Sequence, residues 1–295
     1  MSWLDDFPAL GAEQLSALRR GVDGAFRQFT RDYGVVLERL FEPLRDFLIH
    51  SERLLTQSPW PLVLAAIALV AWLASRNWRI VVSAVATLLV IGWFGMWQDT
   101  MKTIAMIFVC TVVAIAVGLP IGIGMSRSDR MQRIVSPVLD VMQTMPSFVY
   151  LIPVVMLLGI GRVPGLIAVV IYAIPPVIRF TNLGIRLVDK DLLEAADAFG
   201  SSVWQKLRQV QIPLALPTIM GGINQTIMLS LSMVVIASMI GVQGLGQPVL
   251  RAITNQYFTM GLLNGMAIVG IAIMFDRVSQ AYGKRLQRHL EVVHG

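Results

Sequence analysis

The sequence has few charged residues and a single cysteine. Asp, Glu, Lys and Arg make up 14% of its 295 residues, whereas about 25% is usual in soluble domains. The lone Cys110 excludes an internal disulfide and any zinc or iron–sulfur site held by several cysteines. The three histidines, His50, His289 and His294, share no metal-ligand spacing and flank the apolar runs. We therefore predict no metal site and no catalytic residues, which argues against an enzyme.

The sequence also lacks the GxxxxGK[ST] loop that cradles nucleotide phosphates. The nearest string, Gly283-Lys284, has neither the preceding glycine nor the following hydroxyl residue. We therefore expect no ATP site of this type and no cofactor in this chain.

Apolar residues, in contrast, are abundant. They make up 56% of the sequence, against about 45–50% in soluble domains, and the mean hydropathy is +0.69. Uncharged runs of this length predict an all-α, polytopic membrane protein, because backbone groups in lipid must be paired within the segment. The expected spans, about seven, are residues 60–75, 80–97, 103–125, 138–160, 163–180, 214–240 and 260–280.

Positive charge is distributed unevenly over the connections between these spans. The turn 75–79, the loop 126–133, the segment 179–211 and the C-terminal tail carry fourteen Lys and Arg, whereas the opposite short loops carry three. This bias predicts that the first set, including the C-terminus, is cytoplasmic. It also explains the net charge of +6 without nucleic-acid binding. An odd number of spans would then place the N-terminus outside.

The chain divides into four regions on composition. Residues 1–58 carry an apolar stripe at helical spacing opposite a charged face, with Gly34 and Pro43 expected to break or kink the helix. Amphipathic helices on the membrane surface and a soluble helical hairpin packed on the protein both fit this pattern. The other expected regions are an accessory helical hairpin (59–98), a membrane core (99–282) that contains a cytoplasmic loop (184–213), and a basic tail (283–295).

The long cytoplasmic loop predicts a helix, a turn and a second helix. Asp189 and Asp191 suit the start of the first helix, and Gly200 suits a left-handed cap at its end. Ser201 or Ser202 would cap the second helix. The small Ala195 and Ala196 would let a partner protein approach closely. A solvated loop helix with an ordinary glycine cap explains the same pattern.

Polar residues inside the spans are candidates for a translocation pathway, because they are costly in lipid. They are Gln143, Thr144, Asn224, Gln225, Ser230 and Ser232, and the aromatic residues Phe148 and Tyr150 could face a quaternary ammonium group. Hydrogen bonds between helices and ordinary aromatic packing are the simpler explanations. Gly118 with Gly122, and Gly261 with Gly265, have the GxxxG spacing that permits close helix approach.

The loop text EAADAFG, followed after nine residues by VQIP, resembles the EAA loop of ABC importer permeases. Glu194, Ala195, Ala196, Gly200 and Pro213 match the family pattern, whereas Val210 and Ile212 stand where Ile and Leu are usual. The strings DVMQTMPSFVYLIPVVMLLGIG, YAIPPVIRFTNLGIR and INQTIMLSLSMVVIASMIGVQGLG are similar to the narrower ProW-like permeases, over roughly residues 100–280. That family imports glycine betaine, proline betaine or choline.

The resemblance implies a type I ABC importer permease that works by alternating access. Two such chains would form a homodimer in the lipid membrane, which would be a bacterial inner membrane. Two copies of a separate ATPase, which hold ATP and Mg, would bind the EAA loops. A substrate-binding protein would deliver solute from outside. The same machine for another solute, such as an amino acid, is one alternative. An ATPase-independent channel or carrier, or a membrane scaffold, would leave the EAA loop unexplained.

Overall fold

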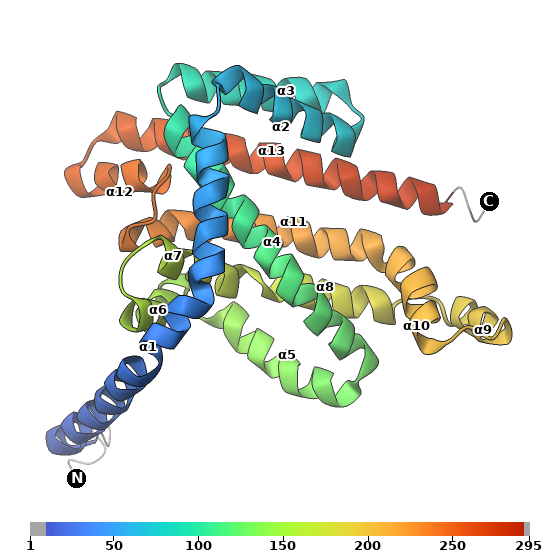
Figure 1. Ribbon diagram of the computed structural model, residues 1–295, viewed down its shortest axis with the longest axis horizontal. Coiled ribbons are helices and arrows are strands. Elements are labelled where there is room, and N and C mark those ends of the chain that lie inside the picture. The colour runs from blue at the N-terminus through green and yellow to red at the C-terminus, as the bar shows by residue number, and fades with distance from the viewer. Residues whose placement is uncertain (1–9, 292–295) are drawn as a thin grey trace, which may run out of the picture.

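The computed structural model describes residues 10–291, and every regular element in that range is a helix (Figure 1). The longer helices are α1 (Ala12–Gln57), α2 (Trp60–Ser75), α3 (Trp78–Trp93), α4 (Trp97–Arg127), α5 (Asp129–Thr144), α7 (Arg162–Ala173), α8 (Pro175–Arg186), α11 (Ile212–Ala237) and α13 (Phe258–Glu291). The shorter ones are η2 (Ser147–Tyr150), α6 (Leu151–Leu158), α9 (Lys190–Ala198), α10 (Val203–Gln205), η3 (Lys206–Gln211), η4 (Ser238–Ile240) and α12 (Gly246–Asn255).

The all-α membrane architecture is confirmed. Within the described range, four helical segments are long and apolar enough to cross a membrane, and up to six cross if each sharply bent pair forms one span. The four are α4, α7 with α8, the segment from α10 to η4, and α13. Each of the seven expected spans falls on helical structure, but 138–160 covers parts of α5, η2 and α6, and 163–180 covers α7 and part of α8. α2 and α3 have only 16 residues each.

The expected span at 138–160 is not one continuous helix. The chain instead bends by 112° between α5 and the η2–α6 segment. Met145 is extended there, with ψ at 133°, because the ring of Pro146 disfavours a helical conformation in the preceding residue. The Tyr150 hydroxyl donates to the Met142 carbonyl near the end of α5, so this half-buried backbone group stays paired at the break.

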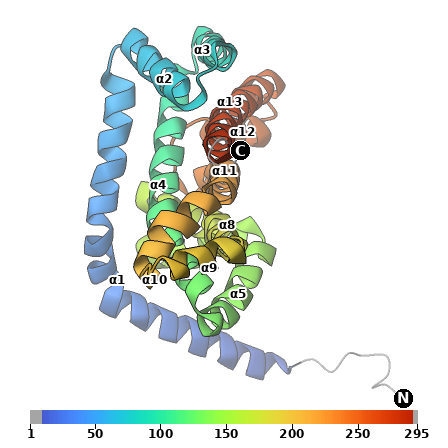
Figure 2. The same cartoon turned by 90° about the vertical axis from the view of Figure 1, so that its right-hand side faces the viewer.

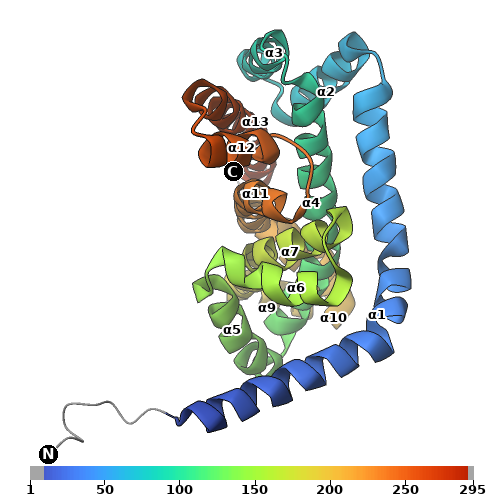
Figure 3. The same cartoon turned by 90° about the vertical axis from the view of Figure 1, so that its left-hand side faces the viewer.

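The N-terminal region forms one long helix rather than a hairpin. Gly34 and Pro43 do not interrupt α1, although Figure 3 shows that the helix is bent. Its C-terminal part packs on α4, α6 and α7 and runs across the direction of α11 and α13 (Figure 1). A helix perpendicular to the spans is the orientation expected of an amphipathic helix on a membrane surface.

The core is formed by α4, α7, α8 and α11, which pack directly on one another. Glycines allow the closest contacts. A Cβ on Gly118 would lie 2.3 Å from Val177 Cγ1, and one on Gly122 would lie 2.7 Å from the Ile178 carbonyl oxygen. The predicted role of this pair in close helix approach is therefore confirmed at the contact between α4 and α8. Gly265, in contrast, faces open space.

The four basic segments gather at one end of the molecule. The turns between α2 and α3 and between α4 and α5, the loop around α9, and the C-terminal part of α13 all lie toward the right of Figure 1. Figure 2 looks onto that end, with α9 and α10 in front. α13 continues as a helix to Glu291, through most of the expected tail, and residues 292–295 lie outside the described residues.

Candidate functional site

The EAA loop folds as a short helix that ends in a tight reversal. Asp189 caps α9, and its carboxylate accepts a hydrogen bond of 3.0 Å from the Asp191 amide. Gly200 then adopts a left-handed conformation with φ at +74°, which residues with a Cβ rarely adopt. The expected helix and its glycine cap are both present.

The second part of the loop differs from the expected separate helix. Ser202 and Gln205 form a reciprocal capping box that starts α10, but the chain then passes through the π-helix η3 directly into α11. Leu207 of η3 is buried with Ile185 and Ala215, so this wider turn is anchored in the core. π-Helical segments occur frequently at functional sites.

An ion pair joins the two arms of the loop. Lys206 Nζ lies 2.6 Å from Asp197 Oδ2, which fixes α9 against η3. At the base of the loop, the Arg186 guanidinium lies 2.7 Å from the Asp129 carboxylate and donates to the Met125 carbonyl at 2.9 Å. The loop is therefore tied both to α11 and to the corner between α4 and α5.

Not every residue of the EAA pattern is accessible. Glu194, Ala195 and Gly200 are exposed, Ala196 is buried, and Val210, Ile212 and Pro213 are half-buried. Around the reversal, the large apolar side chains Phe199, Val203 and Trp204 are exposed, with exposed fractions of 92%, 61% and 62%. We call Glu194, Phe199, Val203 and Trp204 the loop surface. The motif comparison missed its aromatic members because they occupy variable positions between the matched residues.

The structure separates the candidate pathway residues into two groups. Some are exposed on the subunit: Gln143 and Thr144 at the end of α5, Phe148 in η2, and Gln225 and Ser232 on α11. The last two continue a stripe of exposed or half-exposed residues at heptad-like spacing, Gly221, Gln225, Met228, Ser232, Val235 and Met239.

The other candidates make contacts inside the subunit. Tyr150 is buried and meets Tyr172 edge-on, with ring centroids 5.7 Å apart. The Asn224 amide donates to Asp276 of α13 at 3.0 Å. Ser230 is fully buried, and its hydroxyl has no hydrogen-bond partner among the described residues.

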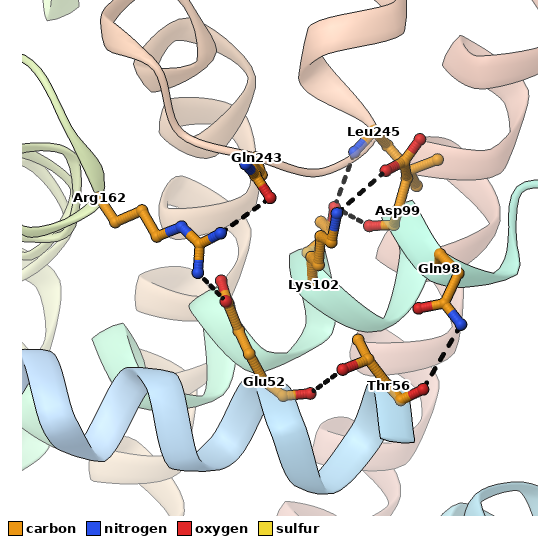
Figure 4. Close-up of polar contacts among 9 residues, drawn as sticks. Glu52, Thr56, Gln98, Asp99, Lys102, Arg162, Gln243 and Leu245 are labelled. Carbon is orange, nitrogen blue, oxygen red and sulfur yellow. Dashed lines mark hydrogen bonds and ion pairs between the residues drawn. The ribbon is translucent and has the colours of Figure 1, made fainter. Parts of the chain in front are cut away.

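A polar network lies at the opposite end, where α1 crosses the starts of α4 and α7. Figure 4 shows Glu52 pointing from α1 toward Arg162, whose guanidinium also points toward Gln243. The Arg162 Nη1–Glu52 Oε2 distance is 2.6 Å, and the Nη2–Gln243 Oε1 distance is 2.9 Å. Nearby, the Leu245 amide donates to Thr103 Oγ1 at 3.0 Å. Burial raises the pKa of the Glu52 carboxyl, and the charges of Arg162 and Lys102 offset this only in part.

Comparison with known proteins agrees with this geometry. Residues 114–288 match the sequence model of the family described as "Binding-protein-dependent transport system inner membrane component". The chain is 48% identical to the glycine betaine/proline betaine transport system permease protein ProW of Escherichia coli, over 81% of this chain and 68% of that protein. It is 47% identical to the glycine betaine/carnitine transport permease protein GbuB of Listeria monocytogenes, over 77% of this chain and 81% of that protein.

The fold has a counterpart among solved structures. An inward-facing structure of the MetNI methionine ABC transporter superposes with a TM-score of 0.57, at 21% identity, over 62% of this chain and 92% of the matched chain. That identity supports the fold alone, whereas the family match and the relatives cover most of the core. The chain therefore belongs to the family of inner-membrane permease components of binding-protein-dependent ABC transport systems.

Proposed function

We propose that this permease imports a small quaternary-ammonium solute, such as glycine betaine, proline betaine or choline, by alternating access. The observation that carries the proposal is the geometry of the EAA loop, an exposed helix and reversal fixed to both α11 and the α4–α5 corner. The names of the relatives, which are glycine betaine permeases, support the choice of solute.

Membership of the family has direct consequences for partners. The chain is a transport component and not an enzyme, because ATP hydrolysis in ABC transporters belongs to a separate subunit. The permease works with an ATPase and with a substrate-binding protein, in the inner membrane. We further propose two ATPase copies that hold ATP and Mg, and a binding protein that docks on the outer face.

The loop surface suits docking of the ATPase. Phe199, Val203 and Trp204 are large and exposed, and they lie just before or at the very start of the α10–η4 segment. Aromatic residues on exposed surfaces of this kind commonly dominate binding energy. The left-handed turn at Gly200 presents Phe199 at its tip. The Lys206–Asp197 ion pair holds the two arms of the loop together. A movement of the loop would therefore be transmitted to α11 and not absorbed by bending within the loop.

Two copies of the chain would supply the pathway. The stripe along α11 carries Gln225 and Ser232 among small and flexible residues. Such polar residues suit a surface that faces a water-filled pathway better than one that faces lipid. We propose that this stripe and the exposed Gln143, Thr144 and Phe148 face the second subunit across the path. Phe148 could meet the quaternary ammonium by cation–π contact.

The proposed orientation follows from charge. The end that carries the EAA loop, the α2–α3 turn and the C-terminal part of α13 is rich in Lys and Arg. We propose that this end, and with it the C-terminus, is cytoplasmic. The Glu52–Arg162–Gln243 network then lies on the outer side, beside the expected docking face of the binding protein.

Reconstitution tests the function directly. The chain is assembled with its ATPase and binding protein in vesicles, and uptake of labelled glycine betaine is followed with and without ATP. We expect uptake that requires ATP, the ATPase and the binding protein. Uptake without the ATPase would support a channel or carrier instead. ATP-dependent uptake of an amino acid but not of betaine would support the same type of transporter with a different solute.

A glycine substitution tests the coupling role of the loop. Gly200→Val should reduce ATPase binding and transport at least tenfold, because a β-branched residue is strained at a φ of +74°. Gly95→Val is the matched control, since Gly95 has a φ of +76° and equally open surroundings, but lies between α3 and α4. Binding of the purified ATPase to each variant in nanodiscs is the measurement, and equal loss in both would contradict the docking role.

A further inference from the structure

A hollow lies beside the core, between the α2–α3 turn and the C-terminal part of α13. Its volume is about 520 Å³, and its lining includes Arg76, Trp78 and Ile80 from the turn and Arg277, Lys284 and Arg285 from α13. α2 and α3 run over α13 in both Figure 1 and Figure 2. Most of the hairpin that covers this hollow precedes the residues that match the family, so its role is not set by that match.

The charge of the hollow is of one sign. Four cationic side chains line it, no carboxylate does, and none of the four forms an ion pair within the described part of the chain. The neighbouring Asp276 does not line the hollow, and it accepts hydrogen bonds from Asn224 and Gln280. Four like charges around one small volume repel one another unless an anion lies among them.

Local backbone structure holds the cations in place. Arg285 Nη1 donates to the Leu73 carbonyl at the end of α2, with a distance of 2.8 Å, which leaves the rest of its guanidinium fork free to bind. Arg76 has a left-handed backbone with φ at 49°, a costly conformation for a residue with a Cβ. Asn77 caps α3 directly after it. The turn therefore holds the backbone of Arg76 in a defined conformation.

The surroundings of the hollow select the kind of anion. It opens where two apolar helices end, and Trp78 beside it is 63% exposed, as in the aromatic belt of a membrane interface. The adjoining helix α2 also exposes Leu69, Val70 and Leu73, which offer a surface for acyl chains. Basic pockets between membrane helices are suited to phosphate-bearing lipid headgroups.

We propose that this hollow is a binding site for the headgroup of an anionic phospholipid. Arg76, Arg277, Lys284 and Arg285 would bind the phosphate, and Trp78 would lie against the glycerol region. The site would connect the accessory hairpin α2–α3 to α13 through a lipid. The proposal stands on the hollow and its charges, and it does not depend on which solute the permease carries.

The test measures lipid binding to the full chain in detergent by native mass spectrometry. The delipidated protein is titrated with phosphatidylglycerol and, separately, with phosphatidylcholine of the same acyl chains. We expect clear preference for phosphatidylglycerol, and a loss of about 25-fold in its affinity in the double variant Arg76→Gln/Lys284→Gln, at about fivefold for each charge. The matched control Arg79→Gln/Arg133→Gln removes two exposed charges outside the hollow and should change affinity less than twofold.

Further arms of the experiment distinguish a lipid headgroup from a free anion, and loss of charge from misfolding. The charge-retaining variant Arg76→Lys/Lys284→Arg should keep affinity within about threefold, which shows that a loss in the Gln variant comes from charge and not from misfolding. Inorganic phosphate is added at about 10 mM, a concentration usual in buffers. Full displacement of the lipid by this phosphate would overturn the lipid assignment in favour of a free anion. Equal phosphatidylglycerol affinity in the Gln variant and the wild type, or equal loss in the control, would overturn the site itself.

Discussion

The core helices and the N-terminal helices are held by different kinds of contact. α4 buries fourteen of its 31 residues, whereas the 46-residue α1 buries only Leu48, Ser51 and Glu52. The core relies on glycines that bring backbones together at Gly118, Gly122 and Gly222. α1 is attached by its C-terminal part, where Leu48 is buried among core residues and Phe47 meets Phe108 of α4 with ring centroids 6.3 Å apart. The Glu52–Arg162–Gln243 network and the contact between Gln98 and the Thr56 carbonyl add polar contacts there.

This difference suggests a division of labour. Close packing does not tolerate small shifts of one helix alone, so α4, α8 and α11 should move together when the permease changes state. The region of family similarity, residues 114–288, contains most of this packed unit. α1 meets this unit only through its C-terminal part and buries three residues there, and so small a contact can open at lower cost than a packed core. The predictions below test whether the two regions separate in this way.

The largest effect is expected in the core. Gly122→Ala should destabilise the protein by about 1–3 kcal/mol, because the new Cβ would lie 2.7 Å from the Ile178 carbonyl oxygen, and backbone cannot give way as a side chain can. Gly265→Ala is the control in another membrane helix, α13, where a Cβ would meet open space. Thermal unfolding in detergent, followed by helical signal, measures both. Equal melting temperatures for the two variants would contradict tight packing of α4 on α8.

A smaller and local effect is expected at the Glu52–Arg162–Gln243 network. Glu52→Ala should weaken the attachment of α1 by about 1–2 kcal/mol, because it leaves the half-buried Arg162 with one partner fewer. The exposed Glu38 on the same helix provides the matched control, Glu38→Ala. Hydrogen exchange should show faster opening of residues 45–57 in the first variant and unchanged exchange in α4. Faster exchange in both helices together would show that α1 and the core are one cooperative unit.

The sequence predicts the helical segments well, because their signals are local. Apolar runs place the spans, and a glycine after an amphipathic stretch predicts the left-handed end of α9. Pro146 and Pro153 predict that the helix is kinked or broken within 138–160, but they do not predict that the bend is 112°. The direction after the break depends on tertiary contacts such as Tyr150 with Met142 and Tyr172.

The contacts that the sequence does not predict join distant residues. Glu52 and Arg162 are 110 positions apart, and an exposed glutamate on an amphipathic helix has the same local pattern as a buried one. The π-helix η3 and the short α12 also depend on how neighbouring helices pack, since neither has a distinct local signal. The pathway residues illustrate the same limit: Ser230 and Ser232 are the same residue type between large apolar neighbours, yet Ser230 is buried and Ser232 is exposed.

The smallest expected effect is a pH dependence of the attachment of α1. Burial raises the pKa of the Glu52 carboxyl when α1 is docked, and the pKa returns to its ordinary value when α1 is released. Between these two values the docked state binds more protons, so docking is strongest below the released pKa and weakens as pH rises through the docked pKa. Hydrogen exchange of residues 45–57, corrected for intrinsic rates, should therefore show less protection at pH 8 than at about pH 5. Glu52→Gln should remove this slope, since an amide does not titrate, and α4 provides the internal reference. Protection that instead rises with pH in the wild type would mean that the attraction of Arg162 and Lys102 outweighs burial, so that the network is a strong ionic lock and α1 belongs with the core.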